Sequence, residues 1–266
     1  MRRNLVFLKL GGSLITVKDQ PHTPRLEVLG RLASEIAEAL AQNPELQILL
    51  GHGSGSFGHV PASKYKTRQG VQTAEEWNGF IEVWRQATEL NHLVLQALEK
   101  ADLPALALPP SAAVIAQHGK VLRWDLEPLL QGLKQGLLPV IHGDVVFDTV
   151  LGGTILSTED LFVHLVEHIQ PARLLFAGNE AGVWADFPAN TSLLPEITMQ
   201  SFAQVEGRLS GSAATDVTGG MADKVRQIIA MVGAVPGLKA SIFTGEVAGN
   251  VRRALGGEAL GTEAHN

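Results

Sequence analysis

The sequence predicts an α/β fold, a three-layer α/β/α sandwich in which helices cover both faces of a mainly parallel sheet. Short apolar runs typical of buried strands alternate with longer stretches whose apolar residues recur at helical spacing. Strand and helix patterns that alternate in this way are the signature of a parallel sheet. The predicted strands are residues 5–10, 47–50, 104–108, 137–141, 173–176 and 240–243.

The predicted helices fill the stretches between these strands. Apolar residues recur at helical spacing through residues 29–40, 75–100, 158–168 and 221–232. The alternation breaks after the fourth strand, where residues 147–155 predict a β-hairpin that turns at Gly152 and Gly153. We expect such an insertion to lie above the main sheet, and we expect residues 207–220 to form a loop that leads into the last helix.

The composition is that of a well-buried, acidic protein. The chain has 266 residues, a hydrophobic fraction of 45% and a formal net charge of −6, without a stretch dense in Lys and Arg. These features argue against nucleic acid as the main partner. The absence of cysteine excludes disulfides, thiolate nucleophiles and cysteine-based metal sites. Without an apolar run of about 18 residues or a signal-type cleavage site, the sequence predicts a cytoplasmic protein with no membrane partner.

Glycine-rich segments follow the predicted strands or open a helix. They are KLGGS at residues 9–13, GHGSGSFGH at 51–59, GD at 143–144, GNEAG at 178–182 and TGGMADK at 218–224. Ligands bind beyond the carboxyl ends of the strands in an open parallel sheet. Glycine lets backbone N–H groups approach an anion closely, and lysine supplies charge for phosphate oxygens. Any one of these loops could be a tight turn, but together they predict phosphate binding.

The common nucleotide-binding fingerprints do not fit these loops. Residues 51–58 do not read as a P-loop, and the turn after the first strand lacks the dinucleotide pattern. Residues 53–58 match the spacing G-x-G-x-x-G, but they follow the second strand, and no clear helix is expected to begin there.

The ordered set of motifs resembles the amino acid kinase superfamily and, within it, the isopentenyl phosphate kinase family. The resemblance covers residues 5–255, and its motifs are KLGGSLITVK at 9–18, HGSGSFGH at 52–59, GDVV at 143–146 and TDVTGGMADK at 215–224. His59 is the specific mark, because superfamily members that phosphorylate carboxylates or carbamate lack this histidine. Fosfomycin kinases, which phosphorylate a phosphonate, carry a similar one.

The resemblance implies transfer of the γ-phosphoryl group of ATP, with Mg²⁺, to isopentenyl phosphate, which gives isopentenyl diphosphate. It also implies a homodimer and a single amino acid kinase domain over residues 1–266, with the acceptor side at about 1–150 and the ATP side at about 151–266. No residue is assigned as a metal ligand. A fosfomycin-type phosphonate kinase and a non-catalytic nucleotide-binding protein of the same fold remain alternatives.

Individual roles follow from the same resemblance. Lys9 and Lys18 would stabilise the transferring phosphoryl group, and Asp144 would orient lysines rather than act as a base. His59 has no expected helix or strand face to occupy and would hydrogen-bond the acceptor phosphate. The expected acceptor-binding residues are Gly53, Ser54, Gly58, His59 and Thr158, and the expected nucleotide-binding residues are Lys9, Gly11, Gly12, Gly55, Asn179, Gly220 and Lys224.

Other residues have structural interpretations. His52 and His142 each end a predicted strand, and we expect both to be structural. Phe80, Val83 and Trp84 are expected in a helix, where they would pack in the core or wall a short prenyl chain. The sequence departs from the resembled pattern at residues 178–184, which lack two aspartates, and at residues 157–160, which read STED where the family usually has GD.

Overall fold

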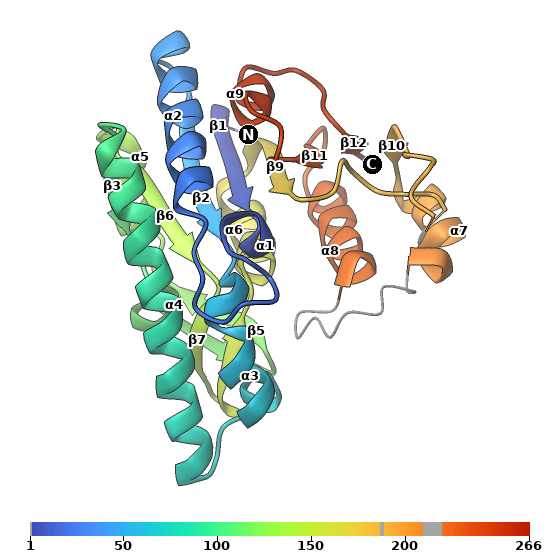
Figure 1. The fold of residues 1–266 in the computed structure, drawn as a ribbon. Helices are drawn as coiled ribbons and strands as arrows, with labels where there is room; N and C mark the ends of the chain where they lie inside the picture. Colours follow the sequence, from blue (N-terminus) through green and yellow to red (C-terminus); the bar gives the residue numbers. More distant parts are fainter. Residues whose placement is uncertain (1, 187–188, 210–219) are drawn as a thin grey trace.

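The protein is built around a mainly parallel β-sheet (Figure 1). The computed structural model describes residues 2–186, 189–209 and 220–266. Its strands are β1 (Arg2–Leu10), β2 (Gln47–His52), β3 (Ala105–Ala107), β4 (Val114–Gln117), β5 (Lys120–Trp124), β6 (Leu138–His142), β7 (Asp144–Asp148), β8 (Gly152–Leu156), β9 (Pro171–Gly178), β10 (Glu196–Ile197), β11 (Lys239–Thr244) and β12 (Thr262–Ala264).

The main sheet has the strand order β10-β12-β11-β9-β1-β2-β6-β3. The pairing of β11 with β12 is antiparallel, and the other pairings in this sheet are parallel. Each of the strands predicted from apolar runs lies in this sheet, which confirms the predicted α/β fold.

A smaller sheet has the order β5-β4-β7-β8. The predicted hairpin is confirmed as the antiparallel pair of β7 and β8, although its glycines begin β8 instead of forming the turn. Strands β4 and β5, which pair beside it, were not predicted. Residues 120–124 of β5 are mostly exposed or half-buried and lack the apolar run by which buried strands are found.

Helices cover both faces of the main sheet. The described helices are α1 (Gly12–Ile15), α2 (Leu26–Gln42), α3 (His59–Tyr65), α4 (Ala74–Lys100), α5 (Glu127–Lys134), α6 (Thr158–Ile169), α7 (Met199–Leu209), α8 (Gly220–Ala234) and α9 (Asn250–Leu255). Leu32 of α2 and Leu90 of α4 pack in the core on one face, and Phe162 of α6 and Val225 of α8 pack in the core on the other. Figure 1 shows α2 and α4 beside one half of the molecule and α8 beside the other. The three-layer prediction is confirmed.

The predicted helical stretches correspond to α2, α4, α6 and α8. The predicted loop at 207–220 overlaps the end of α7, and its residues 210–219 lie outside the described chain. Within the described residues, none of the helices is long and apolar enough to cross a membrane.

The alternation of side chains along β1 determines where its last charged residue points. Val6 and Leu8 lie in the core beneath α2 and α4, whereas Leu5 and Phe7 lie in the core beneath α6 and α8. Successive side chains of a strand point to opposite faces, so Lys9 shares the face of Leu5 and Phe7. It therefore projects toward α6 and α8 at the carboxyl end of the sheet.

Glu35 of α2 fixes the start of α9. Its carboxylate accepts hydrogen bonds from the backbone N–H groups of Gly249 at 2.9 Å, Val251 at 2.9 Å and Arg252 at 3.3 Å, and from Arg31 at 2.7 Å. The Glu35 side chain is buried. Removal of this carboxylate would leave buried donors without their acceptor, which is the costly way to break a buried polar contact.

We therefore expect Glu35→Ala to lower the free energy of unfolding by about 3 kcal/mol, measured by urea denaturation. Glu38→Ala on the same helix is the matched control, because Glu38 forms an exposed ion pair with Arg252 at 3.0 Å. Exposed pairs contribute less than about 1 kcal/mol. Equal losses in the two variants would contradict the assignment of Glu35 as the contact that fixes α9.

Candidate active site

In the described part of the chain, two neighbouring pockets open at the carboxyl edge of the main sheet and share one wall. The His59 pocket is lined by residues that include Ser54, Gly58, His59, Ala62, Arg68, Val83 and Ile155. The Asn179 pocket is lined by residues that include Gly11, Lys18, Phe176, Gly178, Asn179, Met221 and Phe243. The residues that line both are Lys9, Gly12, Ser13, Glu159 and Lys224. A group bound in one pocket would therefore meet a group bound in the other at these residues.

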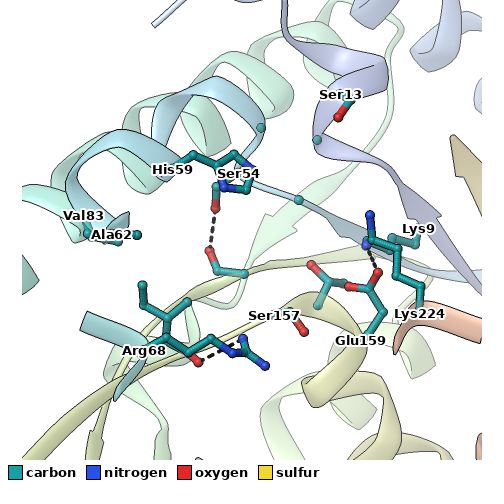
Figure 2. Close-up of a pocket in the computed structure, with 17 residues that line it drawn as sticks. Lys9, Ser13, Ser54, His59, Ala62, Arg68, Val83, Ser157, Glu159 and Lys224 are labelled. Atoms are coloured by element: carbon teal, nitrogen blue, oxygen red, sulfur yellow. Dashed lines mark hydrogen bonds and ion pairs between the residues drawn. The ribbon is translucent and has the colours of Figure 1, made fainter. Parts of the chain in front are cut away.

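The shared wall contains a buried ion pair between Lys9 of β1 and Glu159 of α6 (Figure 2). The side chains are 10% and 6% exposed. Burial by itself would raise the pKa of Glu159, but the positive charges of Lys9 and Lys224 outweigh it and leave that pKa below its ordinary value. Glu159 is therefore an ionised carboxylate that holds Lys9 between the pockets.

A capping box sets where α6 begins. The Ser157 hydroxyl accepts a hydrogen bond from the Asp160 N–H at 3.1 Å, and the Asp160 carboxylate accepts one from the Ser157 N–H at 2.8 Å. The Thr158 hydroxyl donates to the His52 carbonyl oxygen at 2.7 Å, which ties α6 to β2. Because that hydroxyl hydrogen is used in this bond, the expected anion contact of Thr158 would come from its backbone N–H at the helix start.

The glycine loops after β1 and β2 pack backbone against backbone. The Gly53 N–H donates to the Leu10 carbonyl oxygen at 3.0 Å. A Cβ atom added to Gly12 would lie 2.3 Å from the Gly55 nitrogen, and Gly55 itself has a φ of +51°. A larger residue at either glycine would force the loops apart. These contacts bring Gly12, Gly53 and Gly55 together at the pocket walls, as the sequence predicted for a strand-end site.

His59 is the first residue of α3 and lines the pocket that carries its name. The expectation that no clear helix begins after residues 53–58 is wrong, because a short 3-10 turn at Gly55–Phe57 leads directly into α3. Pro61, an apparent helix breaker, lies in the first turn, where its missing N–H would have no helical partner.

The Asn179 pocket gathers most of the other predicted residues. Lys18 follows α1, and Asn179 follows β9 in the segment where the sequence departs from the resembled pattern. Gly220 begins α8, and Lys224 lies one turn further along the helix. Thr218 and Gly219 of the same motif lie outside the described residues.

Asp144, expected to orient lysines, contacts Ser111, Val145 and His142 in the structure. Its carboxylate accepts hydrogen bonds from the Ser111 N–H at 3.2 Å and the Val145 N–H at 2.9 Å, and it lies 3.6 Å from His142. Burial raises the pKa of Asp144 to about 6. The carboxylate that pairs with Lys9 is that of Glu159, a residue not predicted for the site. The acidic STED run at the start of a helix was the signal that could have identified it.

Comparison with known proteins agrees with this geometry. The model of the amino acid kinase family matches residues 4–243. The chain belongs to the amino acid kinase family. Isopentenyl phosphate kinase of Methanocaldococcus jannaschii is 34% identical, with 97% of this chain and 98% of the relative covered. The enzyme of the same name from Methanothermobacter thermautotrophicus is also 34% identical, with 96% of each chain covered.

A solved isopentenyl phosphate kinase structure superposes on the chain with a TM-score of 0.82 and 29% identity, covering 98% of this chain and 99% of that one. Within the amino acid kinase family, the chain therefore groups with the isopentenyl phosphate kinases. These similarities do not favour a fosfomycin-type kinase or a non-catalytic nucleotide-binding protein.

Next to the kinase site, His52 and His142 form a buried stack at the ends of β2 and β6. Their rings lie 5.3 Å apart at an angle of 9°. Burial lowers the pKa of His52, whose ring also contacts the Asn91 side chain at 3.0 Å. Burial and the neighbouring His52 lower the pKa of His142 to about 3. Both residues are buried among packed elements, in agreement with the structural role expected for them.

We expect the stability of this kinase to fall as the pH drops below about 6.5. An unfolded His142 binds a proton near pH 6.5, whereas the folded protein excludes it down to about pH 3. Stability present above pH 6.5 is therefore lost at about 1.4 kcal/mol per pH unit. Asp144 has the opposite effect on stability. Its pKa is raised in the folded protein to about 6, so between its ordinary pKa and about pH 6 it stabilises the folded protein as the pH falls and offsets part of this loss.

The measurement compares urea denaturation at pH 7.5 and pH 5.0 for the wild type and His142→Leu. The variant lacks the buried imidazole, so its free energy of unfolding should depend less on pH than that of the wild type. His92→Leu, at an exposed position of α4, should keep the wild-type dependence. The same pH dependence in His142→Leu and the wild type would contradict the prediction.

Proposed function

We propose that this chain transfers the γ-phosphoryl group of ATP to isopentenyl phosphate and forms isopentenyl diphosphate. The observation that carries the proposal is the shared wall of Lys9, Glu159 and Lys224 between two pockets. A phosphoryl group that passes between two anionic substrates needs fixed positive charge midway. The names of the relatives support this assignment of donor and acceptor.

The His59 pocket combines the properties needed for a prenyl monophosphate. Ser54, His59 and the start of α6 give this pocket polar groups that a phosphate would contact. Gly53, Gly58 and Thr158 contribute backbone to the same wall. Val83 and Ile155 line another part of the pocket and offer an apolar surface to a short hydrocarbon chain. An amphipathic acceptor fits this division.

The Asn179 pocket would hold ATP. Gly11, Gly12 and Lys18 lie along the side that follows β1, and Lys224 projects from α8. The loop that contains Gly55 adjoins this wall through its contact with Gly12. Apolar side chains of Phe176, Met221, Ile228, Ile242 and Phe243 form the remaining wall and suit the base and sugar.

Mg²⁺ fits the site as a companion of the nucleotide. Among the described residues, no group of three or more His, Asp or Glu side chains is arranged to hold a metal ion. Mg²⁺ generally keeps waters and substrate phosphates as ligands and needs few protein groups. Mg²⁺ bound together with ATP would neutralise part of the charge of the phosphates.

The chain's own residues would act by position and charge. An oxygen of the acceptor phosphate, which is ionised near neutral pH with a second pKa of about 6, attacks the γ-phosphorus. The bond from that phosphorus to the bridging oxygen of ADP breaks, and ADP leaves. Lys9, held by Glu159, and Lys18 would face the transferring group, Lys224 would face the nucleotide phosphates, and His59 would orient the acceptor. No general base is required.

We also propose that residues 1–266 form a single catalytic domain. We propose a cytoplasmic location, where ATP is available.

We further propose a homodimer formed through the N-terminal half. Apolar side chains are exposed there: Ile81 and Trp84 expose 48% and 40% of their surface on α4, and Leu106 exposes 38% on the edge strand β3. Light scattering at micromolar concentration should give about twice the chain mass of 28.4 kDa. The mass of a single chain would contradict the dimer.

The acceptor assignment is tested at His59. We expect His59→Ala to lower kcat/KM for isopentenyl phosphate by about 10²-fold or more, because a hydrogen bond to the acceptor phosphate is lost. His59→Gln keeps an N–H donor and should retain part of the activity, and ATP affinity should stay near normal in both. Steady-state kinetics with varied acceptor provide the measurement.

His168→Ala is the matched histidine control, since this residue is exposed on α6 away from both pockets. Assays with fosfomycin in parallel would show whether the acceptor is a phosphonate. Full activity of His59→Ala on isopentenyl phosphate would remove His59 from the acceptor site. A wild type that phosphorylates fosfomycin but not isopentenyl phosphate would overturn the proposed function.

A further inference from the structure

Asp160 lies beside Glu159 in the first turn of α6 but has a separate set of partners. One carboxylate oxygen, Oδ2, accepts hydrogen bonds from the Ser157 hydroxyl at 2.7 Å and from Arg68 Nη2 at 2.9 Å. The other, Oδ1, accepts from Gln227 Nε2 at 2.6 Å. The Asp160 side chain is 13% exposed. One carboxylate thus joins the start of α6 to a segment of the His59 pocket and to α8.

The bond from Asp160 to Arg68 connects α6 to the His59 pocket. Arg68 lies in a short turn after α3, lines the His59 pocket and also donates to the Ile155 carbonyl oxygen at 3.4 Å. Figure 2 shows its guanidinium group directed toward Ser157, another residue that lines the pocket. A guanidinium has five N–H donors, so the bonds to Asp160 and Ile155 leave others for an anion. The pairing with Asp160 restricts where they point.

The bond from Asp160 to Gln227 connects α6 to α8, the helix that carries Lys224 of the Asn179 pocket. Gln227 follows Lys224 by three positions in α8, so both side chains lie on neighbouring parts of one helix face. Helices α6 and α8 pack against each other, and the bond between Asp160 and Gln227 lies in their contact. The bond ties α8 to the start of α6 about one turn after Lys224, which lies in the wall shared with Glu159.

We propose that Asp160 is a positioning residue that links the two substrate sites, by holding Arg68 toward the acceptor phosphate and by placing Lys224 through Gln227. The inference rests on the proposed function, because it assigns the bond with Arg68 to isopentenyl phosphate binding and the bond with Gln227 to ATP binding. Loss of either partner should disturb one substrate, whereas loss of Asp160 should disturb both.

The test compares Arg68→Met, Gln227→Met and Asp160→Ala in the full chain. Arg68→Met should raise KM for isopentenyl phosphate about tenfold and leave KM for ATP within twofold, since a hydrogen bond to a charged group is lost. Gln227→Met should weaken ATP binding by up to tenfold and lower kcat, with KM for isopentenyl phosphate within twofold. Asp160→Ala should change both.

A double variant separates positioning from general loss of stability. In the Asp160→Ala background, adding Gln227→Met should cause no further loss of ATP affinity, because the bond is already absent. Calorimetric titration with ATP alone measures this without turnover. Gln96→Met is the matched control, since Gln96 is exposed on α4 and its amide contacts only His92 of the same helix within the described residues.

Additive losses in the double variant, or partner variants that each alter both substrates equally, would overturn the proposal. So would an Asp160→Ala protein that melts at a lower temperature but keeps both KM values. A wild type inactive on isopentenyl phosphate would count against the proposed function. In that case, the ATP titrations of Gln227→Met and the double variant would still decide whether Asp160 positions α8.

Discussion

The buried ion pair of Lys9 and Glu159 is the constraint on which the rest of the site depends. Two charges removed from water each carry a desolvation cost of several kcal/mol, so the pair is stable only if its geometry is good and other charges are near. Lys224 supplies further positive charge next to Glu159. The wall shared by the two pockets therefore includes two lysines and one ionised carboxylate among its described side chains.

Two elements have to be placed correctly for this pair to form. The alternation of β1 points Lys9 to the face covered by α6 and α8. The capping box of Ser157 and Asp160 starts α6 so that Glu159 falls in its first turn. An acidic residue there is also stabilised by the dipole of the helix. The same turn thus provides a carboxylate for lysine orientation and backbone N–H groups for an anion.

Much of the fold and part of the site could be predicted from the sequence because the signals are local. Apolar runs and helical spacing gave the main strands and helices, and the glycine motifs gave Lys9, His59 and Lys224 as residues at the pocket walls. The pairing of Glu159 was not predicted, because it depends on how α6 lies against β1. Asp144 was expected in the site because its motif resembles that of the kinase family. In the structure, the smaller sheet begins at Asp144 with β7, and the residue is buried there.

Part of the His59 pocket is lined by an apolar cluster beside the smaller sheet. Val83, Phe80 and Val145 form a small apolar cluster with Ile155 packed against it, separate from the two cores beneath the main sheet. Val83 and Ile155 line the pocket, Phe80 packs behind them against Gly153, and Trp84 is partly exposed. Of the three α4 residues expected either to pack in the core or to wall a prenyl chain, Val83 lines the pocket, Phe80 packs in the cluster, and Trp84 is partly exposed.

That separation has a physical consequence for the acceptor. A change in the volume of Val83 or Ile155 would act first on this cluster, whereas Phe7 of β1 and Phe162 of α6 pack in a different core. Core substitutions act mainly on the side chains they touch, because the interior is closely packed. In the proposed site, such a substitution would therefore reshape the apolar wall more than the charged wall of Lys9 and Glu159.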